Sequence, residues 1–208
     1  MIRSGFVIQN PITLSRTTVL ETGSETSGRG WLLEHRSPPH AGPDVQEHFH
    51  MKWTETFEII AGEASYRLNH ETKSASAGTS IVMPPRQPHI HPWNAGDTEL
   101  VYRQRNDFGG VDAQAVDDVL GIFATRAGLV REGLCDEKGR PKHPLQLAVM
   151  LKTLVKHGGY DASMSVAKQN FLAATLGTIG SLLGYKAVHE RYVAQPLMTV
   201  EQVASWRG

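Results

Sequence analysis

The first half of the chain consists of short apolar and β-branched runs separated by turn residues. The runs are FVIQ, ITLSRTTVL, GWLLEHR, TFEIIAG, ASYRL, TSIVMP, HIHPW and ELVYRQR, and they extend to about residue 106. Loops rich in Pro, Gly, Ser and Asn separate them, of which SPPHAGPD and NHETKSASAGTS are the clearest. Eight or so short strands with turn signals between them are typical of a β sandwich or barrel. We therefore expect a mainly β fold built as one double-sheet jelly roll.

After residue 106 the apolar positions recur at intervals of three and four residues, which predicts amphipathic helices. In the first helical segment these positions are Val116, Val119, Leu120, Ile122 and Phe123. The segment 143–158 repeats the spacing, with Pro144 at its start and Gly158 as its stop. A third, longer helix is expected over residues 165–193.

The two patterns divide the chain into a β part and an α-helical C-terminal extension. Gly109 and Gly110 interrupt both patterns, so we place the boundary there, between residues 1–108 and residues 109–208. A chain of this length buries one substantial core, or one core with a helical appendage. We expect the extension to pack on the barrel or on a second subunit.

The stretch 171–185, FLAATLGTIGSLLGY, is apolar almost all round. Its fifteen residues fall short of the roughly twenty that a membrane span needs, so we do not expect it to cross a bilayer. Gly177, Gly180 and Gly184 share one helical face, which favours close approach of another backbone. Contact with a membrane surface is the alternative.

Composition excludes several classes of partner. Lys plus Arg and Asp plus Glu each total 21, so no net charge attracts nucleic acid or anionic lipid. Cys135 is the only cysteine, which excludes an internal disulfide and suits a reducing compartment. The N-terminal sequence has no long apolar region of the secretory type. We expect a cytoplasmic protein.

Candidate metal ligands lie within the β segments. His48 and His50 are two apart, so in a strand they point to the same face. Glu55 heads the next β run, and an antiparallel hairpin would bring its carboxylate beside them. His89 supplies a third imidazole, and His91 either supports it or replaces it as a ligand. Neutral imidazole and carboxylate oxygen suit transition ions, so we expect one such ion per chain.

The positions Gly42, His48, His50, Glu55 and Gly62 resemble the first motif of the cupin superfamily, GxxxxxHxHxxxxExxxxxxG, without insertion. The second cupin motif, GxxxxxPxGxxHxxxN, is met in part. Gly78, Pro84 and His89 match it, whereas Arg86 replaces its glycine and Asn94 comes one residue late. We expect Arg86 to adopt ordinary dihedrals and to point to solvent. With its helical C-terminus, the chain is similar to small single-domain cupins (Cupin_2 type) of uncharacterised role.

The resemblance implies a double-stranded β-helix whose metal ligands are His48, His50, Glu55 and His89. The ion would be Fe, Mn, Ni or Zn, with about two coordination sites open to water or substrate. Cupins with this ligand set include dioxygenases, decarboxylases and isomerases that act on small oxygenated organic molecules. We therefore expect a metal-dependent enzyme, in particular an oxygenase, with Glu55 as ligand and general base. The alternative is a non-catalytic small-molecule-binding or sensor module. The resemblance also implies a homodimer.

Two orientations remain open for the strand VYRQR. Either Arg103 and Arg105 face the pocket, where they would bind a substrate carboxylate, or Tyr102 and Gln104 do. Charged side chains are usually exposed, which favours the second orientation. His35 and the histidines at positions 40, 70, 143, 157 and 189 lack the metal-site context, so we expect them at the surface or hydrogen-bonded in the core.

Overall fold

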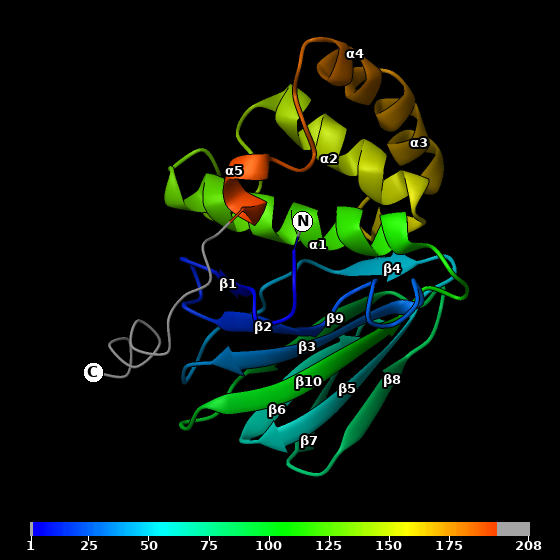
Figure 1. Ribbon diagram of the computed structural model, residues 1–208. Coiled ribbons are helices and arrows are strands. Elements are labelled where there is room, and N and C mark those ends of the chain that lie inside the picture. The colour runs from blue at the N-terminus through cyan, green and yellow to red at the C-terminus, as the bar shows by residue number, and fades with distance from the viewer. Residues whose placement is uncertain (1, 195–208) are drawn as a thin grey trace.

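The computed structural model describes residues 2–194, and its β strands form two antiparallel sheets (Figure 1). The larger sheet has the order β1 (Val7–Gln9), β2 (Arg16–Glu21), β3 (Gly30–Ser37), β10 (Leu100–Asp107), β5 (Thr54–Ala61) and β8 (Ser80–Met83). The smaller sheet has the order β11 (Gly159–Asp161), β4 (His48–His50), β9 (His89–Asn94), β6 (Glu63–Leu68) and β7 (Glu71–Ser76). The expected mainly β, double-stranded β-helix fold is therefore confirmed.

One apolar cluster fills the space between the sheets at the end of the barrel away from the helices. It combines Phe57 and Ile59 of β5 with Ala64 of β6 and Leu100 of β10, all almost fully buried. These residues alternate with exposed ones along their strands, as the period of two requires. The alternation explains why this half of the sequence could be assigned to strands.

The hairpin expected between His48 and Glu55 is not formed. Strand β4 pairs with β9 and β11, whereas β5 pairs with β10 and β8 in the other sheet. Residues 51–53 therefore cross from one sheet to the other, and Glu55 faces the histidines across the barrel rather than beside them. The sequence indicated a turn but not whether the chain returns to the same sheet.

The expected loop over NHETKSASAGTS is also wrong in part, because it contains β7. Asn69 and His70 have φ values of 51° and 66°, which close a tight hairpin between β6 and β7. Strand β7 is the edge of its sheet and is exposed except at Ala75, so it carries polar residues in place of an apolar alternation.

Two of the expected helices are present, and the second has the expected ends. Helix α1 (Ala113–Arg131) begins at Asp112, whose side chain accepts a hydrogen bond from the backbone N–H of Ala115. Helix α2 (Pro144–Lys156) has proline at its first position, and Gly158 follows it with a φ of 85°. Figure 1 shows α1 lying nearest the strands, with α2 beyond it.

The expected third helix is broken into α3 (Val166–Ala174), α4 (Leu176–Leu182) and α5 (Glu190–Val193). The break lies at Thr175, whose ψ of −84° departs from helical geometry. Gly177 and Gly180 do lie against another backbone, and that backbone is α2. A Cβ atom on Gly180 would lie 3.0 Å from the carbonyl oxygen of Leu145. Gly184 lies beyond α4 with a positive φ, so it ends the helix rather than sharing its contact face.

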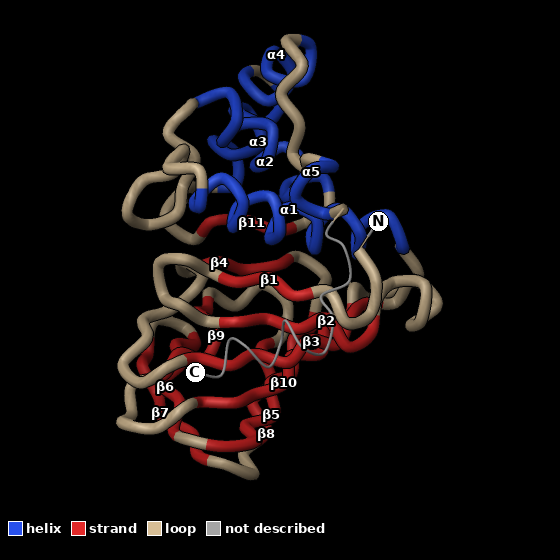
Figure 2. Tube along the Cα trace, turned by 60° about the vertical axis from the view of Figure 1, so that its left-hand side comes forward, coloured by secondary structure: helices blue, strands red, loops and turns tan. Residues whose placement is uncertain are grey.

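The helical part and the barrel are joined in two ways. Strand β11 follows α2 in sequence and pairs with β4, so the smaller sheet includes a strand from the C-terminal half (Figure 2). Val116, Val119 and Leu120 of α1 are fully buried in one cluster with Trp31 and Leu33 of β3. The barrel strands of the first half end at Asp107, near the expected boundary. The division into two domains stays a prediction.

Candidate metal centre

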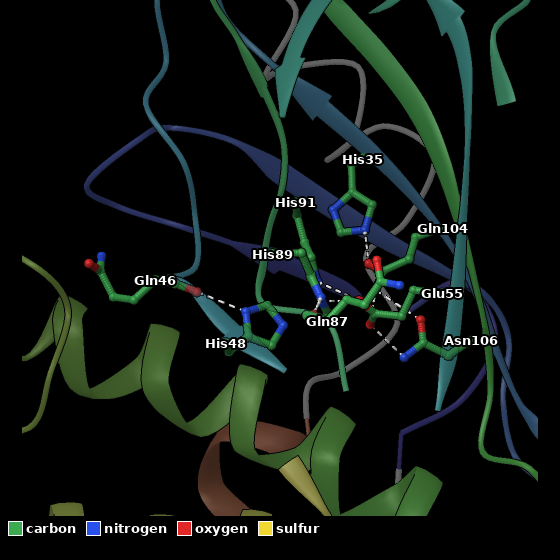
Figure 3. Close-up of polar contacts among 9 residues, drawn as sticks. All are labelled: His35, Gln46, His48, Glu55, Gln87, His89, His91, Gln104 and Asn106. Carbon is green, nitrogen blue, oxygen red and sulfur yellow. Dashed lines mark hydrogen bonds and ion pairs between the residues drawn. The ribbon is translucent and has the colours of Figure 1, made fainter. Parts of the chain in front are cut away.

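Four side chains with metal-binding atoms meet between the two sheets. His48 on β4, Glu55 on β5, and His89 and His91 on β9 place one donor atom each within 4.8 Å of one another (Figure 3). His48 and His89 are direct partners in the ladder between β4 and β9, and their ring centroids lie 4.4 Å apart. The larger sheet contributes Glu55, which is 2% exposed. The fold therefore gathers three imidazoles and one carboxylate at a buried point.

Hydrogen bonds fix which nitrogen of each ring faces this point. Nδ1 of His48 lies 2.8 Å from the carbonyl oxygen of Gln46, and Nδ1 of His89 lies 2.8 Å from that of Gln87. A carbonyl only accepts, so each Nδ1 carries a proton and each Nε2 faces inward, where a neutral ring offers a lone pair. Nε2 of His89 then lies 3.0 Å from Oε2 of Glu55. A histidine nitrogen and a carboxylate oxygen at this distance share a proton or, once the nitrogen is deprotonated, bind one divalent metal ion.

The carboxylate of Glu55 is held from its other side by two amides. Oε1 accepts hydrogen bonds from Nε2 of Gln104 at 2.9 Å and from Nδ2 of Asn106 at 2.7 Å. Oε2 contacts Nε2 of both His89 and His91, the latter at 2.9 Å. Glu55 and Asn106 are direct partners in the ladder between β5 and β10. The two oxygens therefore have separate roles, because Oε1 is anchored by the sheet and Oε2 faces the histidines.

The protonation states suit a metal ion. Burial, followed by the nearby His89 and His91, lowers the pKa of His48 well below its usual value. Burial also opposes ionisation of Glu55, but the charges of His91 and His50 and the hydrogen bonds from His89 and His91 outweigh it and hold the Glu55 pKa well below its usual value. At neutral pH His48 is therefore neutral and Glu55 is ionised, the forms that bind metals.

Three of the four ligands expected from the sequence, His48, Glu55 and His89, belong to this group, and His91 completes it. His50 is buried, and its ring stacks on Trp53 at a centroid distance of 4.3 Å. The centroid of the same ring lies 5.0 Å from that of His89, so His50 adjoins the group without belonging to it. The sequence offered His91 as a candidate because residues two apart in a strand share a face.

The orientation of β10 follows the second of the two alternatives. Tyr102 and Gln104 are buried, whereas Arg103 and Arg105 point outward toward the acids Glu34 and Glu21. The alternation also brings Asn106 into the site, a residue that the sequence analysis did not select. Period-two alternation from Gln104 could have indicated it.

His35 connects the site to a neighbouring cavity. Its Nε2 lies 2.9 Å from Oε1 of Gln104 and its Nδ1 lies 2.9 Å from Oγ1 of Thr17. The expectation of a hydrogen-bonded core histidine is thus confirmed, and burial lowers its pKa to about 4. His35, Gln104 and His91 line a cavity of about 70 Å³ together with side chains of α1.

Arg86 has a φ of 67°, so the expectation of ordinary dihedrals is wrong at this position. The turn keeps the left-handed conformation for which the cupin motif uses glycine, and the backbone N–H of Arg86 donates to the carbonyl oxygen of His50. Its side chain is exposed, as expected.

The barrel is similar to known proteins. Residues 36–102 match the family model described as Cupin domain. A predicted oxalate decarboxylase from Thermotoga maritima is similar at 19% identity and a TM-score of 0.42, over 51% of this chain and 97% of that one. A conserved protein with a double-stranded beta-helix domain from Klebsiella pneumoniae has 19% identity and a TM-score of 0.39, over 53% and 84%. No curated protein sequence matches the chain.

Proposed function

Because residues 36–102 form a cupin domain, we propose that the metal centre built into it makes this protein a metal-dependent enzyme that acts on a small oxygenated organic molecule. The inward-facing Nε2 atoms of His48 and His89 opposite the Glu55 carboxylate carry the proposal. The ligands that we propose are His48, Glu55, His89 and His91, with His50 as the alternative to His91 that the cupin motif favours. We infer three candidate reaction classes: oxygenase (in particular dioxygenase), isomerase and decarboxylase.

A bound divalent ion of Fe, Mn, Ni or Zn would supply Lewis-acid chemistry, and a redox-active ion would add electron transfer. The chain itself supplies a base at Oε2 of Glu55, which stays ionised at neutral pH and lies beside His91 on the cavity wall. Gln104 and Asn106 hold the other oxygen, so Oε2 keeps its orientation while it accepts or returns a proton. The buried surroundings limit the access of bulk water to this atom.

Elemental analysis of the purified protein tests the proposal. We expect about one transition ion per chain in the wild type and loss of that ion in His89→Ala. His91→Ala and His50→Ala then discriminate between the two ligand sets. If the cluster in the structure holds the ion, His91→Ala lowers metal affinity about 10- to 100-fold or more, and His50→Ala retains the ion.

His40→Ala serves as the control, because its side chain is 67% exposed and contacts Asp97, which does not belong to the cluster. Retained metal in His89→Ala, or a wild-type protein that takes up no transition ion from supplemented medium, would contradict the metal centre. If His50→Ala loses the metal and His91→Ala retains it, the ligands are instead those of the cupin motif, with His50 in place of His91.

A non-catalytic binding or sensor module is the second candidate, and one observation favours it. Helix α1 both lines the cavity and shares the core of the barrel, so a ligand in the cavity contacts the extension directly. Binding of a small molecule with no turnover in any of the three reaction classes would favour this candidate over the enzyme.

We also infer a cytoplasmic homodimer. Exposed apolar side chains on α3 and α4 support the self-association, among them Phe171, Leu182 and Leu183 at 66%, 82% and 66% exposure. Within residues 2–194, no helix has the length and apolar character needed to cross a bilayer. Size-exclusion chromatography with light scattering would measure the assembly, and a monomer at micromolar concentration would contradict it.

A further inference from the structure

The cavity beside the candidate metal centre is shared between the barrel and the helical extension. Its lining includes His91, Gln104 and His35 from the barrel, and Phe123, Arg126, Ala127 and Val130 from α1. Its volume of about 70 Å³ corresponds to on the order of five water molecules, so only a small molecule fits. The extension therefore takes part in deciding what enters.

Among residues 2–194, Arg126 is the one Lys or Arg side chain that lines this cavity. Its Nε, Nη1 and Nη2 atoms donate to the carbonyl oxygens of Gly139, Asp44 and Lys138 at 2.9, 2.8 and 3.1 Å. A guanidinium has five N–H groups, so one on Nη1 and one on Nη2 remain for another acceptor. Among residues 2–194, no carboxylate oxygen lies within 4.0 Å of these nitrogens. The cation is thus held in place by neutral groups, and the carboxylates of Asp44 and Asp136 influence it only from beyond direct contact.

Asp44 is the acid of the cavity wall, and its carboxylate is occupied elsewhere. Oδ1 accepts from Nδ2 of Asn10 at 2.7 Å and from Oγ of Ser15 at 2.7 Å, and Oδ2 lies 2.6 Å from the same Ser15 hydroxyl. Thr13 donates to Oδ1 as well. These donors turn the carboxylate of Asp44 toward the N-terminal segment, and only its backbone carbonyl reaches Arg126.

We propose that Arg126 binds the carboxylate of a small organic acid whose other oxygen atoms reach the metal centre. A planar fork with two free N–H groups matches the two oxygens of a carboxylate. The apolar side chains of Phe123, Ala127 and Val130 would cover a short hydrocarbon segment of the acid. Contact between the acid and the metal centre rests on the proposed function. Binding of its carboxylate depends on Arg126 alone.

The strand arginines considered as carboxylate ligands, Arg103 and Arg105, lie outside the barrel. In their place, Arg126 of α1 supplies the arginine at the cavity. The sequence predicted this helix only as a packing element. One of the outward arginines provides a matched control, because Arg103 is 47% exposed and faces Glu34.

Calorimetric titration with lactate and with lactamide tests the proposal. The two probes differ in charge but hardly in shape, and both fit a cavity of this size. We expect the wild type, both metal-free and loaded with Co²⁺, to bind lactate at least about tenfold more tightly than lactamide, the usual gain from a charge-assisted hydrogen bond. Equal affinity for the two probes, or no lactate binding, would overturn the proposal without any variant.

Variants then locate the effect. Arg126→Gln should abolish the preference for lactate, Arg126→Lys should weaken it about fivefold or more because the fork is lost, and Arg103→Gln should leave it unchanged. Circular dichroism establishes that each variant is folded. A folded Arg126→Gln or Arg126→Lys protein that retains the wild-type preference would overturn the assignment. Co²⁺ content is measured separately, so failure to bind the ion contradicts the proposed function, while titration of metal-free protein still reports on Arg126.

Discussion

Single side chains at the candidate site are ordered by chains of hydrogen bonds rather than by packing alone. Nε2 of His35 donates to Gln104, which in turn donates to Glu55. Because the amide oxygen of Gln104 only accepts, the tautomer of His35 is fixed with its proton on Nε2. Nδ1 then accepts from the hydroxyl of Thr17. The carboxylate at the centre is therefore supported by two layers of neutral donors.

His35 should make the stability of the protein depend on pH. Its pKa is about 4 in the fold against 6.5 when unfolded, because burial disfavours the charged ring. The unfolded chain therefore binds the proton first, and the free energy of unfolding falls as the pH drops from about 6.5 to about 4. The contribution of His35 is about 3 kcal/mol at most. Urea denaturation of metal-free protein at several pH values measures this dependence. Over this pH range the free energy of unfolding of His35→Gln should fall less than that of the wild type.

The control for this measurement is His40→Gln, because the side chain of His40 is 67% exposed. The difference between wild type and variant isolates His35 from the other buried histidines. If His35→Gln loses as much stability as the wild type over this pH range, then His35 is not held neutral by the fold.

At this scale the sequence predicted the residue types of the site better than their geometry. The motif located His48, Glu55 and His89, and strand alternation kept His91 as a candidate. It did not predict the stacking of His50 on Trp53, because the path of the chain between β4 and β5 decides it. The backbone of Arg86 was mispredicted for the same reason. Its left-handed conformation is stabilised by a hydrogen bond to His50, a residue distant in sequence.

Strands and helices were predicted where their periodicity is strong, as in β3, β5, β10, α1 and α2. Elements whose stability depends on a partner were missed, as β7 and the three-residue β11 illustrate. Strand β11 exists because β4 offers it a pairing edge, with Tyr160 stacked on Phe49. The division between α3 and α4 likewise depends on α2, against which α4 packs through glycines. Sequence periodicity carries no information about such partners.

The contact between α4 and α2 should depend on the absence of a side chain at Gly180. An added Cβ would lie 2.7 Å from Cγ1 of Val149 and 3.0 Å from the carbonyl oxygen of Leu145, so the helices would have to separate. We expect Gly180→Ala to lower the free energy of unfolding by about 1–3 kcal/mol, less the gain in helix propensity of up to about 1 kcal/mol. Urea denaturation measures the change.

Gly110→Ala is the matched substitution, because a Cβ there would meet nothing within 4 Å. It should leave stability unchanged or raise it slightly, since alanine restricts the unfolded chain. A Gly180→Ala protein as stable as Gly110→Ala would mean that α4 is not packed on α2 as the structure describes.

For the molecule as a whole, the main question is whether the barrel and the extension fold separately. The composition change near residue 108 suggested two domains, and the barrel strands of the first half do end at Asp107. Yet Trp31, Leu33 and Phe108 share a buried cluster with α1, and β11 belongs to the smaller sheet. The apolar positions of α1 were identified from their spacing, but the sheet face that they cover was not. Domains are defined by such contacts, which a single sequence does not reveal.

A core substitution in α1 should therefore destabilise both parts together. Leu120 is fully buried in the shared cluster, and we expect Leu120→Ala to lower the free energy of unfolding by about 2–5 kcal/mol through lost burial and a residual cavity. Val111→Ala, at a side chain that is 72% exposed, should change it by less than about 0.5 kcal/mol. In a Trp206→Phe background, tryptophan fluorescence reports on Trp31, Trp53 and Trp93 in the barrel, and helical circular dichroism reports mainly on the extension. A shared core requires both signals to move to the same lower midpoint in Leu120→Ala, whereas two separated transitions would establish independent domains.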